Sequence, residues 1–299
     1  MRHHYIPEFY LRNFCTREHN GKNSIWVFHE RRAPFKANIE NVAVMKNFYT
    51  TDKISDKNGV EKLLSMIESH AAPILQKIIS RSFILTKQEK LDFSYFLAFL
   101  WLRTPYFRKL FERNAEKIAK ESMKIIASNP EKFSVSMREM EAETGEKVGD
   151  EEESLRKDFL EDKYNLKFDL ILYLQTLFYL GHNPEIWGRI ASMWWTFFIS
   201  SKEHEFITSD NPFVLFNPSI PDNSFYGYGI GQKDIQITVP LSPRICLQLT
   251  WCDCGRVVHV TDKTVRAINC RTAAWVAEHI YSSSKAKFIL DVIGRRFKI

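Results

Sequence analysis

The sequence predicts an α+β protein with a helical middle and a C-terminal antiparallel β-sheet that an N-terminal β segment joins. Two observations predict this class. Apolar residues recur at helical spacing between residues 60 and 200, and they alternate with a period of two between residues 206 and 260. The composition has 44% hydrophobic and 26% charged residues, which is typical of a globular protein and excludes a disordered or collagen-like chain.

The N-terminal residues 1–55 are expected to form a β-rich segment. A strand at 24–28 follows the turn signal Asn20-Gly21, which predicts a hairpin with residues 9–14. A further strand is expected at 48–51.

Helices are expected to fill residues 60–200. One begins near Val60, and Pro73 should kink or split it. Thr86 and Glu89 have the spacing of a capping box, which opens a helix that runs to Arg103 and ends at a Thr-Pro step. A polar helix then continues to about residue 128.

Residues 131–155 are rich in Glu and Gly, and we expect a mobile acidic excursion there. A helix over 155–180 should end at Gly181. The step Asn183-Pro184 predicts the start of another helix, which carries Trp194 and Trp195.

The C-terminal part is expected to hold strands at 206–209, 213–216, 235–239, 245–251 and 257–260. A final helix should begin at Thr261-Asp262 and run to about residue 280, and a basic tail follows at 283–299. Since hydrophobic helices resume on both sides of the acidic stretch, we predict a single domain over residues 1–299.

The charge is unevenly distributed along the chain. Residues 131–163 hold 12 acidic and 6 basic side chains, so the rest of the chain holds 36 basic and 24 acidic ones. This basic remainder favours an anionic partner such as a nucleic acid or a nucleotide, although net charge also serves solubility.

Cysteine number and the lengths of apolar runs indicate the compartment. The five cysteines are an odd number, and the N-terminus has no apolar targeting segment. Both features favour reduced thiols in the cytoplasm. The longest apolar runs, at 93–102, 170–180 and 190–199, have about ten residues, which is too short to span a bilayer and typical of buried core helices.

The segment 3–14, with the sequence HHYIPEFYLRNF, concentrates polar and aromatic side chains. Neighbouring side chains on an extended segment point to opposite sides, so at most one of His3 and His4 faces a given pocket. A neutral imidazole can bind a metal or act as a general base near pH 7. The alternative is a terminal strand that its aromatic residues anchor and whose histidines cap backbone groups.

Two features of the helical part have candidate chemistry. Glu61 and Glu68 are two helical turns apart and lie on one face, where they can bind a divalent cation or form a solvated flank. Arg103, at the end of an apolar helix, can hold a phosphate or cap the last carbonyls of that helix.

The segment 208–212, with the sequence TSDNP, interrupts an apolar strand. A loop carboxylate such as Asp210, held by rigid strands, suits a metal ligand or a general base. Asp and Asn before Pro are also ordinary turn residues, so an Asx turn at Asp210-Asn211 is the alternative.

These motifs together resemble a mainly bacterial family, domain-of-unknown-function family 4238. The resemblance rests on the segments 3–14, 47–49, 103–105, 206–212, 240–243 and 280–282, together with Glu61 and Glu68, and it extends over nearly the whole chain. It implies a single domain in bacterial or phage-related contexts, and it implies no settled activity.

The leading functional hypothesis is a metal-dependent nuclease or related phosphodiesterase, because the polar motif residues supply metal ligands, a base and an anion clamp if they converge. The expected Mg²⁺ or Mn²⁺ ligands are His4, Asp210, Glu61 and Glu68. In this hypothesis His3 activates water and Arg103 holds a phosphate oxygen. The residues expected to contact the nucleic acid or nucleotide are Tyr5, Arg12 and Asn211.

Two other functions remain open. In a non-catalytic module that binds a nucleotide or a protein, the same polar residues form a buried hydrogen-bond network. A transferase that acts on a nucleotide is the third hypothesis. A nuclease requires its carboxylates near a common point and open to solvent, whereas a structural network pairs them with arginines and backbone amides.

Overall fold

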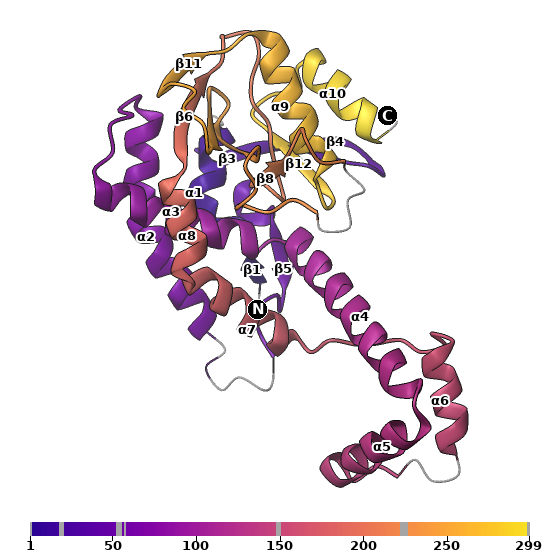
Figure 1. Ribbon diagram of the computed structural model, residues 1–299. Helices are drawn as coiled ribbons and strands as arrows, with labels where there is room; N and C mark the ends of the chain where they lie inside the picture. Colours follow the sequence, from indigo (N-terminus) through magenta and orange to yellow (C-terminus); the bar gives the residue numbers. More distant parts are fainter. Residues whose placement is uncertain are drawn as a thin grey trace. The chain divides into compact units, whose positions relative to one another are not determined.

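The computed structural model describes residues 2–17, 21–51, 56, 58–147, 151–221 and 227–297 (Figure 1). The predicted α+β class is confirmed, with helices in the middle of the chain and an antiparallel sheet in the C-terminal part. The chain divides into two compact units. The first unit comprises residues 1–108 and 174–299, and the second comprises residues 109–173.

Short strands and turns begin the first unit. They are β1 (Arg2–His4), α1 (Glu8–Leu11), the 3₁₀ turn η1 (Arg12–Phe14), β2 (Thr16–Arg17), β3 (Asn23–His29), β4 (Arg32–Asn38), η2 (Ile39–Asn41) and β5 (Val44–Lys46). β1 and β5 pair antiparallel, with His4 opposite Val44. The strand predicted at 24–28 is confirmed as β3, and the strands predicted at 9–14 and 48–51 are wrong. Residues 9–14 are helical because a helix begins directly after Pro7 and buries Tyr10, Leu11 and Phe14 on one side.

Helices α2 (Gly59–Ile79) and α3 (Lys87–Leu102) pack against each other, and α8 (Pro184–Ser192) packs on α3. α2 continues through Pro73 without a break, and its apolar stripe is buried. The predicted capping box at Thr86 and Glu89 is confirmed. The predicted break after Arg103 is also confirmed, since α3 ends at Leu102 and α4 (Pro105–Ala127) begins at the proline.

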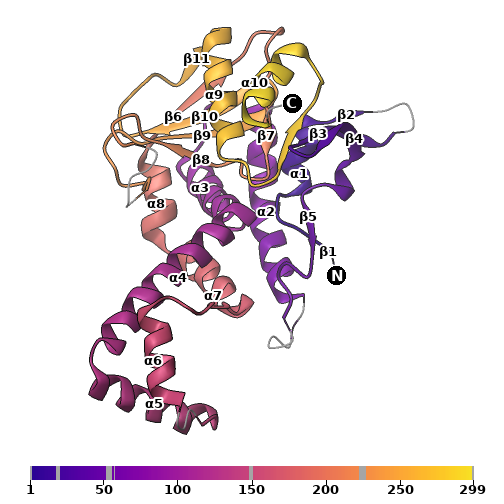
Figure 2. The ribbon, with the colours of Figure 1, turned by 90° about the vertical axis from the view of Figure 1, so that its right-hand side faces the viewer.

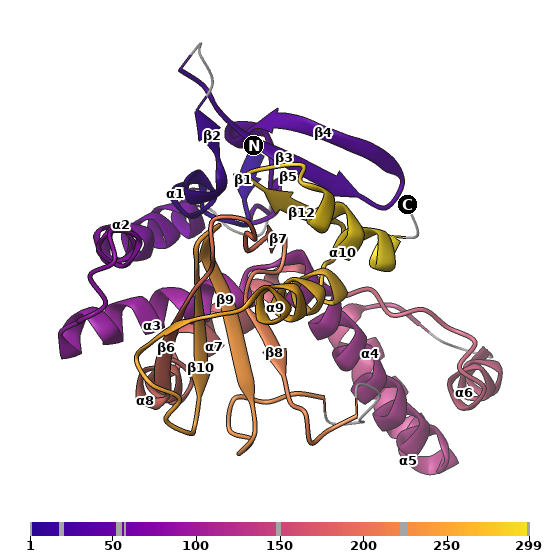
Figure 3. The same cartoon turned by 90° about the horizontal axis from the view of Figure 1, so that it is seen from above.

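One five-stranded sheet is built from C-terminal strands in the order β11-β6-β10-β9-β8, and Figure 3 shows β6, β10, β9 and β8 side by side. Its strands are β6 (Trp194–Ile199), β8 (Val214–Phe216), β9 (Gln236–Ser242), β10 (Ile245–Thr250) and β11 (Val257–His259). All neighbours are antiparallel except β11, which is parallel to β6. The helix predicted through Trp194 and Trp195 is wrong. Since β6 is buried on both faces, its apolar run has no alternation that distinguishes a strand from a helix.

A second sheet pairs strands of the N-terminal part of the chain with strands of the C-terminal part, and Figure 2 shows its strands β2, β3 and β4 close to α10. β12 (His279–Ser282) lies between β3 and β7 (Thr208–Ser209) and is antiparallel to both. α9 (Asp262–Ala274) and α10 (Lys287–Phe297) pack together, and a core that includes Phe28, Ile280 and Ile293 lies beneath them. The predicted final helix is six residues too long, because Trp275–Glu278 turn into β12. The predicted basic tail is largely helical as α10.

The second unit is built from helices. The acidic stretch contains α5 (Pro130–Thr144) and α6 (Glu152–Leu160), whose buried Phe133 and Met137 form a small core with Ala127. The prediction overlooked these apolar residues because acidic ones outnumber them. The single helix predicted over 155–180 is in fact α6 followed by α7 (Leu170–His182). Gly181 lies inside α7 and does not follow it. A Cβ at position 181 would collide with the ring of Phe99, so this position requires glycine.

No disulfide joins the five cysteines, all of which the structure describes. Within the described ranges, no helix has both the length and the apolar character needed to cross a membrane.

Candidate functional site

A polar cavity of about 210 Å³ lies in the first unit between the N-terminal segment, α2 and the end of α3. Its polar lining residues are His4, Glu8, Tyr49, Glu61, Ser65, Glu68 and Arg103. Four of these, His4, Glu61, Glu68 and Arg103, are site residues predicted from the sequence. They come from three segments that are far apart in the chain, and the fold brings these four together, whereas His3 and Asp210 of the same hypothesis do not line the cavity.

Helix geometry places the two glutamates. Glu61, Leu64, Ser65 and Glu68 recur at spacings of three and four residues, so they share one face of α2, and all four line the cavity. Leu64 is 3% exposed and holds this face against the core. The predicted common face of Glu61 and Glu68 is therefore confirmed.

Arg103 occupies the C-cap position of α3, and its side chain is only 2% exposed. Nε donates a hydrogen bond to the carbonyl oxygen of Tyr5 at 3.1 Å, and Nη1 donates to Oε1 of Glu68 at 2.7 Å. A buried guanidinium requires such partners, because removing a charge from water costs several kcal/mol. The ion pair with Glu68 fixes the guanidinium at the wall of the cavity.

Three buried polar atoms of the cavity lining have no hydrogen-bond partner. They are Nε2 of His4, the hydroxyl of Tyr49 and Nη2 of Arg103. An unsatisfied buried polar atom costs about 1–3 kcal/mol, and few occur in a folded protein. Three such atoms at one cavity indicate a site arranged for a polar ligand.

Burial and nearby carboxylates set the protonation of Tyr49. Burial is the main cause that raises the pKa of its hydroxyl far above the ordinary value of 10. Glu68 and Glu61 act in the same direction, and Arg103 opposes them. Tyr49 is therefore a neutral phenol at every physiological pH, and its O–H group can donate a hydrogen bond to a ligand in the cavity.

His3 lies beside the cavity and is not among the residues that line it. It is fully buried, and its Nδ1 accepts a hydrogen bond from the backbone N–H of Tyr49 at 3.2 Å. Nε2 therefore bears the proton and lies 3.2 Å from the Thr50 hydroxyl. Burial also lowers the pKa of His3. Both ring nitrogens have hydrogen-bond partners, as expected for the alternative in which the histidine stabilises the fold.

Asp210 is likewise not among the residues that line the cavity. Its carboxylate is 1% exposed and accepts three backbone hydrogen bonds, from the N–H groups of Ala277, Glu278 and His279 at 2.7–2.8 Å. Burial raises its pKa to about 6, although the three backbone donors act in the opposite direction. The structure thus does not bring Asp210 to the other predicted metal ligands. Instead, its carboxylate holds the turn that leads into β12.

The three residues predicted to contact a substrate are separated. Tyr5 is buried between the two places: its carbonyl binds Arg103, and its hydroxyl lies 3.5 Å from that of Tyr281. Asn211 is 2% exposed and donates to the carbonyl of Trp275, while its Oδ1 has no partner. Arg12 is exposed and forms a 2.7 Å ion pair with Glu8, which lines the cavity.

Two groups of three residues have ligand atoms within 4.8 Å of one another. Within the described residues, they are His29, Glu278 and His279, where β3 ends and β12 begins, and Glu203, His204 and Asp262 near the start of α9. The four predicted metal ligands form no such group within the described part of the chain. A metal in the cavity would therefore be held by few protein ligands and by water.

Tyr49 and Glu8 are cavity residues that the sequence analysis did not select. Glu8 lies inside the singled-out segment 3–14, and Tyr49 lies inside the motif 47–49. Neither has a spacing that indicates chemistry, because their neighbours in the cavity lie far away in the chain.

The chain belongs to the family described as protein of unknown function, DUF4238, whose model matches residues 2–286. No curated protein and no solved structure matches it.

Proposed function

We propose that the cavity lined by His4, Tyr49, Glu61, Glu68 and Arg103 is the active site of a metal-dependent phosphodiesterase that acts on nucleic acid. One observation carries the proposal: residues of the type required for this chemistry converge on one cavity, and three of their buried polar atoms have no partner there.

The charge of the lining favours a cation. Three carboxylates line the cavity against one guanidinium, and two of them, Glu8 and Glu68, are paired with arginines. A phosphate alone would meet repulsion from this lining. Mg²⁺ binds through one or two carboxylates and keeps several waters, so Glu61 and Glu68 suffice as protein ligands. The bound metal would supply charge neutralisation and a more acidic water.

The other groups have roles that follow from their free atoms. Arg103 is held in place through Nε and Nη1, and its Nη2 has no partner, so the guanidinium keeps N–H donors that suit a non-bridging phosphate oxygen. Nε2 of His4 can accept a proton from the attacking water. The neutral Tyr49 hydroxyl can donate to the leaving oxygen.

The substrate class rests on the charge distribution. Outside residues 131–163 the chain holds 36 basic and 24 acidic residues, which attracts a polyanion to the protein.

The alternative function is a non-catalytic module that binds a nucleotide or a protein. The hydrogen bonds of His3 and Asp210 favour a structural role for those two residues, but the alternative leaves the three unpartnered atoms of the cavity without a purpose.

A cleavage assay tests the proposal. The protein is incubated with labelled RNA, single-stranded DNA and duplex DNA in Mg²⁺, Mn²⁺ or EDTA. The variants are Arg103→Lys, which keeps the charge and loses the planar fork, and Glu61→Gln. Glu185→Gln, at a side chain that is 78% exposed, is the matched control.

We expect metal-dependent cleavage that falls roughly 100-fold in Arg103→Lys and in Glu61→Gln. Glu61→Gln should melt like the parent protein, whereas Arg103→Lys should melt earlier because it loses the buried hydrogen bond from Nε to the Tyr5 carbonyl. Glu185→Gln should cleave like the parent protein. The absence of cleavage with every substrate, or equal cleavage in all variants, contradicts the proposal.

A further inference from the structure

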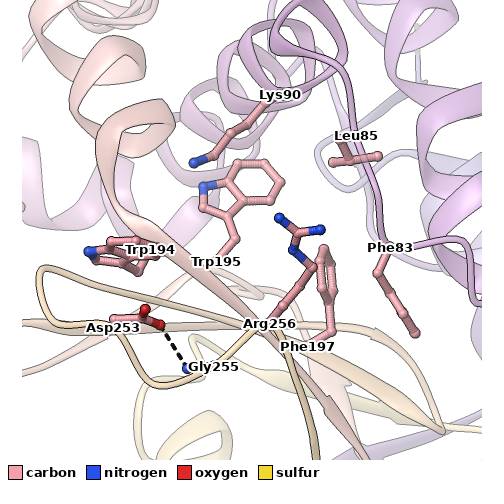
Figure 4. A pocket seen from close by; sticks show the side chains of 9 residues that line it. All are labelled: Phe83, Leu85, Lys90, Trp194, Trp195, Phe197, Asp253, Gly255 and Arg256. Carbon is pink, nitrogen blue, oxygen red and sulfur yellow. Dashed lines mark hydrogen bonds between the residues drawn. The ribbon is translucent and has the colours of Figure 1, made fainter.

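A second pocket, of about 330 Å³, lies in the first unit where the loop between α2 and α3 meets β6 and the turn after β10 (Figure 4). Its volume is at the lower end of the range for small-ligand sites. The residues that matter for recognition are Phe83, Lys90, Trp194, Trp195, Asp253 and Arg256. Lys90 lies near the N-terminal end of α3 and Arg103 follows its C-terminal end, so this pocket is separate from the cavity described above.

The floor of the pocket is rigid. The indole N–H of Trp195 donates to the carbonyl of Ile190 at 3.0 Å, which fixes the ring. The Lys90 ammonium lies 5.4 Å from the centroid of that ring and donates to the carbonyl of Met193 at 3.0 Å. An ammonium group has three N–H bonds, so Lys90 retains donors for a ligand.

Two other side chains that line the pocket, those of Trp194 and Arg256, are exposed and available to a ligand. Trp194 is 52% exposed, and within the described ranges no ring contact or hydrogen bond of its side chain occurs. Arg256 is exposed, and its guanidinium makes no hydrogen bond or ion pair with the described part of the chain. Figure 4 shows Arg256 among the side chains that line the pocket. Among the described lining residues, Asp253 alone has a carboxylate, and it accepts the backbone N–H of Gly255 at 2.9 Å.

The chemistry of this lining is specific. An exposed indole offers a flat surface on which a planar ring can stack, and the two cations that line the same pocket attract an anionic group. A purely apolar ligand would leave Lys90 and Arg256 unused, and a metal ion would be repelled by them. A ligand with a planar base and a phosphate uses both features.

We propose that this pocket is a binding subsite for a nucleoside phosphate, with the base stacked on Trp194 and the phosphate held by Arg256 and Lys90. The nucleoside phosphate is either a free nucleotide or a unit of a single strand. That the bound nucleotide is part of the substrate rests on the proposed function. The binding itself does not, because it is measured without turnover.

The experiment is a titration of the full chain in EDTA, followed by tryptophan fluorescence and calorimetry. The probes are AMP, adenosine, inorganic phosphate and a ten-residue single-stranded oligoadenylate. The variants are Trp194→Ala and Arg256→Ala. Matched controls are Tyr179→Ala, at a tyrosine that is 74% exposed, and Arg31→Ala, at an exposed arginine.

We expect AMP to quench tryptophan fluorescence saturably and to bind at least 10-fold more tightly than adenosine or phosphate, because only AMP uses both halves of the pocket. Trp194→Ala should weaken binding by roughly 5- to 100-fold. Arg256→Ala should weaken binding of AMP and leave that of adenosine unchanged. Binding of the oligoadenylate alone, with the same variant effects, identifies a single strand as the source of the nucleotide.

Absence of saturable binding by both AMP and the oligoadenylate overturns the subsite, and so does an equal loss in the control variants. The two proposals fail separately. Cleavage without binding at this pocket removes the subsite alone, whereas binding without cleavage in any metal removes the phosphodiesterase and leaves the subsite.

Discussion

Two groups of buried polar side chains in the first unit differ in how completely they are hydrogen-bonded. Around Asp210, three backbone N–H groups point at one carboxylate, and both nitrogens of His3 are similarly engaged next to Tyr49 and Thr50. At the cavity, His4, Tyr49 and Arg103 each keep a buried polar atom without a partner. Since unsatisfied atoms are costly, the first group stabilises the fold and the second is expected to meet a ligand.

The difference teaches that residue type alone does not separate these roles. His3 and His4 are adjacent and chemically identical, yet only His4 lines the cavity. The pleat of β1 turns them to opposite sides, so the same residue forms a structural contact at one position and a free ligand atom at the next.

The largest expected effect is the loss of stability when the hydrogen bonds around Asp210 are removed. Asp210→Ala leaves three buried backbone N–H groups without an acceptor, and we expect the free energy of unfolding to fall by roughly 3–5 kcal/mol. Asp291→Ala, at a side chain that is 49% exposed and 3.9 Å from Arg266, is the control and should change it by less than about 1 kcal/mol. Urea unfolding measures both. Equal stability of the two variants would show that the Asp210 contacts do not stabilise the protein.

A smaller effect concerns pH. The pKa of Asp210 rises from about 3.9 in the unfolded chain to about 6 in the folded protein, so the folded state binds this proton more tightly. The free energy of unfolding should therefore fall as the pH rises from 4 to 6, by at most about 3 kcal/mol. Asp210→Asn removes this titration. Unfolding at pH 4, 5, 6 and 7 compares the slopes of the two proteins, and identical slopes contradict the prediction.

A metal should stabilise only the cavity. Mn²⁺ at ten times its dissociation constant raises the free energy of unfolding by about 1.4 kcal/mol if it binds the folded state alone. We expect the melting temperature of the parent protein to rise in Mn²⁺ and that of Glu61→Gln to stay constant. Glu185→Gln should respond like the parent protein. A shift that survives in Glu61→Gln assigns the metal to another place, such as His29, Glu278 and His279.

Local signals predicted much of the fold. The capping box at Thr86, the stripe of α2 and the alternation in β9 and β10 all depend on neighbours within a few turns or residues. β6 was mistaken for a helix because both of its faces are buried, and β12 was missed because its partner β3 lies some 250 residues away in the chain. Strand pairing at such separation leaves no local pattern.

The candidate site was predictable in part for the same reason. The helical spacing of Glu61 and Glu68 is local, and so is the position of Arg103 at a helix end. Whether Asp210 meets a metal or three backbone amides depends on the turn at 277–279, whose approach to residue 210 only the tertiary structure reveals. Tyr49 was missed because its significance is the lack of a partner.

Removing a single hydroxyl group gives the most direct test of the central claim, that the unpartnered atoms of the cavity residues mark the site and partnered atoms mark the scaffold. Two buried tyrosines are compared by removing one hydroxyl from each. The hydroxyl of Tyr10 is hydrogen-bonded to the Thr208 hydroxyl at 2.8 Å and to the carbonyl of Pro240, whereas that of Tyr49 has no partner. Melting temperature and metal-dependent cleavage are measured on the same preparations of Tyr49→Phe and Tyr10→Phe.

We predict that Tyr10→Phe loses about 1–2 kcal/mol of stability and keeps its cleavage rate when folded. Tyr49→Phe should keep or slightly raise its melting temperature and lose cleavage by at least about 10-fold. The contradicting result is a Tyr49→Phe protein that melts as early as Tyr10→Phe and cleaves at the parent rate, because Tyr49 would then belong to the scaffold.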